Sequence, residues 1–227
     1  PVNAVYAWEF TGLDPKTGFA TFKGCSSNED EVEKSDDPAT YLKYVGPADP
    51  RFNGGLSSSL RWKNLTLSAQ FAFGFGNYKR LNFIFEGDNK MPSPQTNMTK
   101  EMLGRWKQEG DQSMIPGLNF SDSNDYMIYT PDRSSSWKNT YTMYNYSDAR
   151  IVKGDFFRCR NLMLSYAVPY QFLRHMGITA VSLGFNVTNP FTPCSSRFNG
   201  QDPEISNKGS VALPITQSYS LSLSVSF

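Results

Sequence analysis

Apolar and polar side chains alternate strictly at the end of the chain. In the segment 217–227 a serine separates each pair of apolar residues, which are Tyr219, Leu221, Leu223, Val225 and Phe227. Because successive side chains of a strand point to opposite faces, this pattern predicts a β-strand with one apolar face and one polar face. A soluble sheet with one wet face gives the same pattern. A transmembrane barrel strand needs it, together with about 9 to 11 residues of length, so we expect this segment to be the C-terminal barrel-assembly strand.

A similar alternation predicts five further strands. They occupy 2–10, 54–62, 65–77, 156–168 and 178–188. Lys63-Asn64 makes a tight reversal between the second and third of these segments. The phenylalanines of this hairpin gather toward one end, as they do where barrel strands reach an interfacial aromatic girdle.

The connections between the predicted strands alternate between long and short. The long ones are 11–53, 79–155 and 189–216, and the short ones lie at 63–64 and 169–177. Bacterial outer-membrane barrels have short periplasmic turns and long extracellular loops. The pattern therefore predicts extracellular long loops and a periplasmic C-terminus.

Six strands are too few for a closed barrel, which takes at least about eight. An open sheet would leave two strand edges unpaired in lipid, where unpaired backbone groups are not tolerated. The predicted fold is therefore all-β, and the chain is expected to be the C-terminal part of a larger transmembrane antiparallel β-barrel. The chain begins Pro1-Val2-Asn3 without an initiator Met or a signal peptide, which agrees with the expectation of a piece of a longer protein.

Composition and charge exclude several classes of function. The 22 Lys and Arg residues balance 21 Asp and Glu residues, which argues against a nucleic-acid partner. Three cysteines without a CxxC spacing and a single histidine, His175, offer neither a metal site nor a Ser-His-Asp triad. Pairing of Cys25 with Cys194 stays open. Asp202 and Glu204 are two residues apart on a loop and do not define a glycosidase geometry. We expect no catalytic residue, no enzyme activity, no metal and no cofactor.

Several motifs stand in an order that resembles one family. They are GLDPKTG (12–18), YVGPADPRFNGG (44–55) leading into RWKNLTLS (61–68), RWKQEGD (105–111) followed by Ile115-Pro116, SDARIVKGDFFRCRNLMLSYAVP (147–169), FNGQDPE (198–204) and the terminal Phe227. Together they resemble the C-terminal quarter of the SusC/RagA-type TonB-dependent transporters of the Bacteroidetes outer membrane. The chain departs from that pattern at Asn189-Pro190-Phe191, where the family usually has Asn-Leu-Phe, and at Cys194.

The resemblance implies a 22-stranded barrel whose lumen is blocked by a plug domain. It also implies a SusD-like or RagB-like surface lipoprotein that closes as a lid, a dimer of transporter–lipoprotein pairs, and import of oligosaccharides or oligopeptides driven by TonB. The plug and the segment that contacts TonB would lie outside this chain. This chain would supply lipid-facing wall, lumen wall and extracellular loops.

Aromatic side chains of the predicted loop 79–155 are candidates for contact with a substrate or with the lid. They are Trp106, Tyr126, Tyr129, Trp137, Tyr141, Tyr144 and Tyr146. Such rings stack on sugars or pack against peptides, but they serve equally well in protein interfaces or in packing a long loop onto itself. Asp122, Asn124 and Asp125 offer oxygen ligands as calcium sites do, but they lack the frame of an EF-hand, and a solvated loop is the preferred interpretation.

Three arginines are expected to face the lumen, namely Arg61, Arg158 and Arg160. They would either line a path for acidic ligands or pair with carboxylates elsewhere in the barrel, because an unpaired buried charge is costly. The alternative from another class is a secreted carbohydrate-binding β-sandwich. A sandwich would carry charges on one face of each strand, whereas most faces here are apolar or small and uncharged.

Overall fold

The computed structural model describes residues 3–85, 97–118, 126–175, 177–205 and 212–227. The chain forms two compact units, which are described separately. The sheet unit comprises 49–77, 153–205 and 213–227, and the aromatic unit comprises 1–48, 78–152 and 206–212. Within the described ranges, no helix has both the length and the apolar character needed to cross a membrane.

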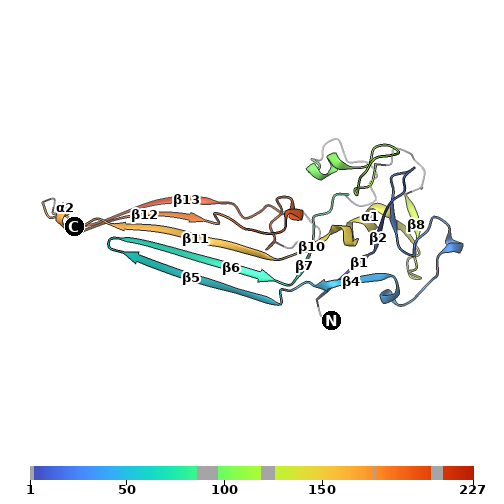
Figure 1. Cartoon of the computed structure of the whole chain (residues 1–227), viewed down its shortest axis with the longest axis horizontal. Coiled ribbons are helices and arrows are strands. Elements are labelled where there is room, and N and C mark those ends of the chain that lie inside the picture. Colours follow the sequence, from blue (N-terminus) through green and yellow to red (C-terminus); the bar gives the residue numbers. More distant parts are fainter. Residues whose placement is uncertain (1–2, 86–96, 119–125, 176, 206–211) are drawn as a thin grey trace. The chain divides into compact units, whose positions relative to one another are not determined.

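The sheet unit is built on one five-stranded sheet with the strand order β13-β12-β11-β6-β5. Each pair of neighbours runs antiparallel, and Figure 1 shows the long strands side by side. The strands are β5 (Phe52–Trp62), β6 (Leu65–Phe75), β11 (Phe156–Ala167), β12 (Ala180–Thr188) and β13 (Ser218–Ser226). Each lies within or largely overlaps one of the predicted segments from 54 onward. The connection from β11 to β12 contains the short helix α2 (Tyr170–Leu173), and η5 (Ser196–Phe198) lies between β12 and β13.

The register of the strands aligns apolar rows across the whole sheet. Leu67 of β6 lies opposite Leu60 of β5 and Leu164 of β11. The row continues from Leu164 to Phe185 of β12 and then to Leu221 of β13. Because side chains alternate between faces, every second residue of each strand joins this apolar face, and the residues between them form the opposite, polar face.

A β-bulge in β11 interrupts the alternation. Arg158 lies opposite Ala72 and Cys159 opposite Phe71, but Asn161 lies opposite Gln70, so Arg160 is the extra residue. Strict alternation would place Arg158 on the same face as Leu162. The bulge instead puts Arg158 on the polar face, in the row of side chains that continues with Asn161 after the bulge.

The aromatic unit contains short strands in pairs. β1 (Ala4–Trp8) pairs with β4 (Leu42–Pro47), β2 (Phe10–Leu13) with β3 (Ala20–Phe22), β7 (Tyr78–Arg80) with β10 (Ile151–Lys153), and β8 (Met127–Tyr129) with β9 (Trp137–Asn139). Its helical turns are η1 (Glu29–Glu31), η2 (Pro38–Thr40), η3 (Lys100–Gly104), α1 (Thr140–Asn145) and η4 (Asp148–Arg150). Asn139 caps α1, because its Oδ1 accepts hydrogen bonds from the N–H groups of Tyr141 and Thr142.

The prediction of one barrel strand over 2–10 is wrong in this structure. The segment forms β1 and β2, and β1 pairs with β4 in the aromatic unit rather than joining the five-stranded sheet. The alternation does not mark two faces here, because Ala7 and Trp8 are both buried while Tyr6 is exposed. The predicted loops 11–53 and 79–155 contain β3, β4 and β7 to β10, most of them three-residue strands too short to show a period.

The hydrophobic core of the aromatic unit consists mainly of rings. Trp8, Phe22, Phe85, Tyr141 and Tyr144 are all buried in one cluster. Phe85 lies 4.7 Å from Tyr141 between ring centroids, and Phe10 meets Tyr144 edge-on at 5.4 Å. The aromatic unit is thus stabilised in the ordinary way of a globular protein, by apolar side chains removed from water.

Candidate functional site

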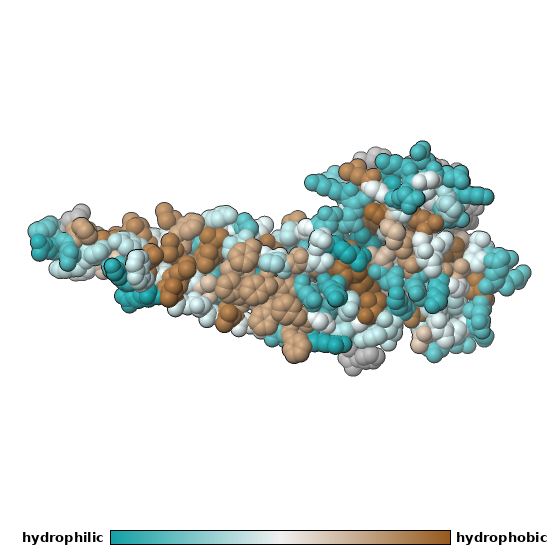
Figure 2. All heavy atoms as spheres, viewed as in Figure 1, coloured by the Kyte–Doolittle hydropathy of each residue, from teal (hydrophilic) through white to brown (hydrophobic). Residues whose placement is uncertain are grey.

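The apolar face of the five-stranded sheet is exposed. Leu60 and Trp62 of β5 are each 67% exposed, and Leu221 of β13 is 79% exposed. The other exposed apolar residues of this face are Phe52, Leu56, Leu67, Phe75, Leu164, Tyr166, Leu183, Phe185, Tyr219, Leu223 and Val225. Figure 2 shows brown apolar side chains along the long strands. Soluble monomers rarely expose an apolar patch that spans a whole sheet, which makes this face a candidate interaction surface.

The opposite face carries small and polar side chains. β13 contributes serines at every second position, and β6 contributes Thr66, Ser68 and Gln70. Hydroxyl groups bond across this face, as between Ser59 Oγ and Ser68 Oγ at 3.2 Å. The five expected barrel-assembly residues, Tyr219, Leu221, Leu223, Val225 and Phe227, are all exposed, and the four within β13 lie on the apolar face.

The polar face ends in a cluster of charges around Arg158. Arg158 Nη2 lies 2.5 Å from Asp202 Oδ1, and Arg158 Nε contacts Glu204 Oε2. Arg160 Nη2 lies 2.5 Å from Glu204 Oε1. The side chains of Arg158 and Asp202 are buried, with only 2% and 4% exposed. The bulge is what allows this arrangement, because it directs Arg158 to the face from which the 202–204 segment is reached.

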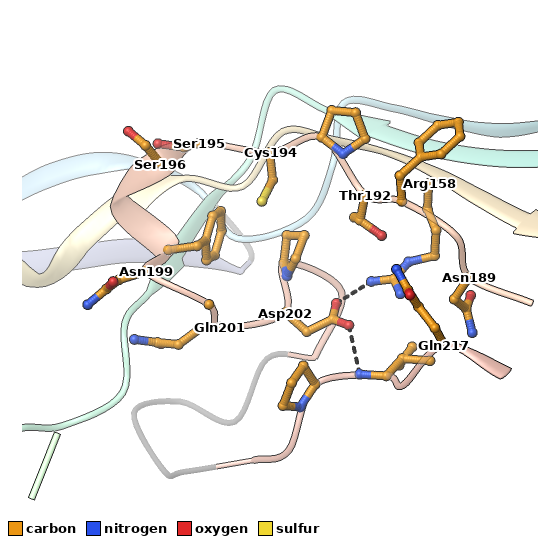
Figure 3. A pocket seen from close by; sticks show the side chains of 17 residues that line it. Arg158, Asn189, Thr192, Cys194, Ser195, Ser196, Asn199, Gln201, Asp202 and Gln217 are labelled. Carbon is orange, nitrogen blue, oxygen red and sulfur yellow. Dashed lines mark hydrogen bonds and ion pairs between the residues drawn. The ribbon is translucent and has the colours of Figure 1, made fainter. Parts of the chain in front are cut away.

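Asp202 joins three parts of the sheet unit. In addition to Arg158, it accepts hydrogen bonds from the N–H groups of Glu204 at 2.9 Å and Ile215 at 3.1 Å. Figure 3 shows the carboxylate between Arg158 and the segment that leads into β13. Burial raises the pKa of Asp202, but Arg158 and the two N–H donors outweigh burial and hold the pKa below its usual value. Asp202 is thus ionised and connects the start of β11 to the segment that leads into β13. We call this connection between Arg158, Asp202 and Ile215 the Arg158 staple.

A hollow of about 450 Å³ adjoins this staple. Its wall includes Asn189, Thr192, Cys194, Gln201 and Gln217 beside Arg158 and Asp202. The carboxylates of Asp202 and Glu204 are both engaged by arginines, so the pair is not available as a general acid and base.

The other expected lumen-facing arginines have different surroundings. Arg61 lies at the end of β5, exposed, and its Nε donates to the carbonyl of Lys63 at 3.4 Å. The Arg160 side chain is 42% exposed and reaches Glu204 from the bulge. Arg158 and Arg160 therefore both pair with carboxylates of the segment 202–204.

Three of the candidate aromatic residues hold the aromatic unit together. Tyr141 and Tyr144 are buried on α1, and their hydroxyl groups donate to the carbonyls of Gly117 at 2.8 Å and Met114 at 2.9 Å. Tyr126 stacks on Tyr141 with 6.3 Å between ring centroids. The prediction that Tyr141 and Tyr144 contact a substrate or a lid is therefore wrong for this structure, because both rings lie in the core.

Trp106 has a similar structural position. A Cβ atom added at Gly18 would lie 2.1 Å from Trp106 Cε3, and one added at Gly117 would lie 2.7 Å from the same atom. The Gly117 N–H also donates to the Gly18 carbonyl at 3.0 Å. The indole is thus enclosed by two glycines, which brings the motif at 12–18 against the motif at 105–111.

The remaining candidate rings lie at or near a hollow of about 470 Å³ in the aromatic unit. Trp137 and Tyr146 line it and are 42% and 44% exposed. Trp8 and Tyr41 line it as well, stacked with 5.4 Å between centroids. Tyr129 packs edge-on against Trp137 at 4.3 Å. The sequence interpretation missed Trp8 and Tyr41, because Trp8 was assigned to a barrel strand and Tyr41 to the long connection 11–53.

Polar groups also reach this aromatic hollow. Lys138 Nζ lies 3.1 Å from Asp132 Oδ2 at its wall. The Ser134 hydroxyl holds the pKa of Asp132 below its usual value, against the effect of burial and with the help of Lys138. Asn139 is buried, and its Nδ2 has no hydrogen-bond partner among the described residues. Rings flanked by such groups can bind a ligand that has both apolar and hydrogen-bonding surface.

Cys25, Cys159 and Cys194 are all free in this structure. The described part of the chain holds no group of His, Cys, Asp and Glu side chains suited to a metal. Asp122, Asn124 and Asp125 lie outside the described residues.

No protein-family model matches the chain, and no curated protein matches it. The chain is similar in fold to a chain of the RagAB peptide transporter, with a TM-score of 0.66 and 23% identity over 99% of its own length. It is also similar to the RagAB peptide importer in the 'closed-closed' state (TM-score 0.65, 23% identity, 98% of this chain) and in the 'open-open' state (0.60, 22%, 98%). It spans 23%, 23% and 22% of those solved chains. At this level of identity the likeness demonstrates a shared all-β fold.

Proposed function

We propose that this chain forms part of a SusC/RagA-type TonB-dependent importer in a bacterial outer membrane. The observation that carries the proposal is the exposed apolar face that continues through all five strands of the sheet, backed by a face of small polar side chains. Lipid would contact the first face and the lumen would lie against the second. The fold shared with chains of the RagAB peptide transporter supports the same proposal.

The dimensions of the strands agree with a membrane wall. β5 and β6 have 11 residues each. At about 3.3 Å per residue and a tilt of about 45°, such strands cover about 25 Å along the membrane normal, the height of the apolar band of such barrels. The phenylalanines at one end and Trp62 and Tyr166 at the other would then lie near the two interfaces.

The rest of the barrel follows from the edges of the sheet. β5 and β13 are its outer strands in the described part of the chain. Inside a membrane both edges need partners, because hydrocarbon offers no hydrogen bonds to the free backbone groups. We assign these partners to further strands of a 22-stranded barrel that contains a plug, with TonB acting through the plug.

The same proposal gives the long connections an extracellular position and the C-terminus a periplasmic one. A SusD-like or RagB-like lipoprotein would cover the extracellular side, in a dimer of transporter–lipoprotein pairs. Trp137 and Tyr146 of the aromatic hollow are exposed and are our candidates for contact with this lid or with an oligopeptide or oligosaccharide cargo. A β-sandwich has less support, because the described sheet unit has no second sheet to cover its apolar face.

Two neighbouring substitutions in β13 test the proposal. In the full-length protein, Leu221→Arg would place a charge in lipid, at a cost of about 2–4 kcal/mol near the bilayer midplane, whereas Ser220→Arg would place it toward the lumen. We expect Leu221→Arg to reduce the folded, heat-modifiable protein in outer membranes severalfold and Ser220→Arg to leave most of it. Equal yields of the two variants would contradict a lipid-facing sheet.

A further inference from the structure

A second hollow of the sheet unit combines phenylalanine rings with basic side chains. It measures about 610 Å³ and lies where β6 ends and β11 begins. Its rings are Phe75, Phe156 and Phe157, and its charged residues are Lys153, Asp155 and Arg197. None of these residues takes part in the Arg158 staple or in the aromatic hollow.

The hollow continues the apolar face of the sheet. Phe75 lies opposite Phe52, and Phe157 lies opposite Phe73, so two of its rings belong to the apolar rows. These rows end in stacked rings, with centroids 5.2 Å apart for Phe71 and Phe157 and 5.6 Å apart for Phe73 and Phe75. A ligand bound here would therefore meet an apolar surface that extends along the strands.

Two of the three charged residues that line the hollow are basic. Lys153 and Arg197 line the hollow and are exposed. Arg51 packs against Gly76, where an added Cβ would lie 3.2 Å from the Arg51 Cβ. The single carboxylate of the lining, Asp155, accepts the Gly76 N–H at 2.6 Å. Basic groups thus outnumber acidic ones, and the acidic one is tied to the backbone of the turn after β6.

We propose that this hollow binds the phosphate-bearing headgroup of a membrane lipid, with the acyl chains lying along Phe75, Phe157 and the apolar rows. The inference rests on the proposed function, because only a lipid-facing sheet brings these residues to the level of the headgroups. Aromatic rings occupy that level in barrels, and basic pockets at membrane surfaces bind anionic headgroups. The charge of Lys153 and Arg197 matches a phosphate, and the phenylalanines match the start of an acyl chain.

Native mass spectrometry of the full-length transporter in detergent tests this inference. Phosphatidic acid and phosphatidylcholine with identical acyl chains are titrated separately, and the first binding constant of each lipid is measured. We expect phosphatidic acid to bind at least about fivefold more tightly, the factor expected for one basic side chain near an anionic surface. The double variant Lys153→Gln/Arg197→Gln should lose this preference and keep its affinity for phosphatidylcholine.

The matched control is Lys63→Gln/Arg174→Gln, which removes one lysine and one arginine, both exposed, at the opposite end of the strands. It should keep the preference for phosphatidic acid. The inference would be overturned, without touching the proposed function, if Lys153→Gln/Arg197→Gln kept the wild-type preference for phosphatidic acid. It would also be overturned if the control variant lost that preference to the same extent. Weaker binding of a lipoprotein partner with unchanged lipid preference would identify the hollow as a protein contact instead. Retention of neither lipid would refute the lipid-facing sheet itself, and with it the inference.

Discussion

Replacing Asp202 by asparagine should loosen the approach to β13 without changing the sheet. The variant keeps the size of the side chain but removes the charge that faces Arg158, which is 2% exposed. Removing one partner of a buried ion pair costs about 3–5 kcal/mol, and Glu204 still faces Arg158, so we expect the lower end, about 3 kcal/mol. At about 1.4 kcal/mol per factor of ten, local opening should become about 100-fold more frequent.

Hydrogen exchange of the full-length protein measures this opening directly. The amide groups of Glu204 and Ile215 donate to Asp202, so peptides that contain them should exchange about 100-fold faster in Asp202→Asn. Peptides from β6 should not change. Asp36→Asn is the control, because Asp36 pairs with Arg133 at 3.6 Å but its side chain is 79% exposed, and such pairs contribute about 0–1 kcal/mol.

Acid should reproduce the effect of the substitution. The pKa of Asp202 is lowered in the folded protein, so its stabilisation is complete above the ordinary value of 3.8 and is lost as the pH falls through the lower folded value. After correction for intrinsic exchange, the Ile215 amide should stay protected from pH 7 to about pH 5, which lies above the ordinary pKa of Asp. Protection should be lost only when the pH falls below that ordinary pKa.

A double-mutant cycle with Arg158→Met identifies the partner. If Asp202 pairs with Arg158, the loss of local opening free energy in the double variant should be smaller than the sum of the losses in the two single variants, by about 1–3 kcal/mol. Additive effects, or an exchange rate in Asp202→Asn within about threefold of the wild type, would refute the staple.

Two further predictions concern other parts of the chain. Gly18→Ala should destabilise the aromatic unit by about 3 kcal/mol, because the new methyl group overlaps Trp106 and Gly18 has a φ of +69°. The control Gly104→Ala should cost little, because a Cβ atom there meets nothing within 4 Å. Chemical denaturation followed by tryptophan fluorescence compares the two variants, and equal midpoints would contradict the enclosure of the Trp106 indole. Partial burial raises the pKa of Cys25 to about 12, so maleimide at pH 8 should label the exposed Cys194 faster than Cys25 in the folded protein, as peptide mapping would report. Equal labelling rates of the two thiols in the folded protein would contradict the raised pKa of Cys25.

The strands of the sheet unit could be predicted because their two faces differ, one being apolar and the other polar. Because one face is apolar and the other polar, every second residue is apolar, and this period is visible in β6 and β13 without any other information. The strands of the aromatic unit have neighbours on both sides, as the burial of both Ala7 and Trp8 shows, so their sequences carry no such period. This difference explains why the prediction failed at 2–10.

The charge cluster could be predicted only in part. Burial of Arg158 requires a carboxylate partner, and that much follows from the cost of an unpaired charge. The identity of the partner does not follow, because Asp202 is 44 residues away in the chain and reaches Arg158 only through the fold. Similarly, the glycine at position 18 suggests a turn, but its contact with Trp106 depends on two segments that meet in space.

The bulge at Arg160 also determines which changes of length the chain tolerates. Side chains alternate between the apolar and the polar face of the sheet, and the extra residue shifts this alternation by one position between Arg158 and Leu162. Loss of a single residue within β11 would leave the composition almost unchanged, yet it would turn either Arg158 or the leucines after it toward the opposite face of the sheet. Single-residue insertions and deletions should therefore be tolerated better in the connections than within β11.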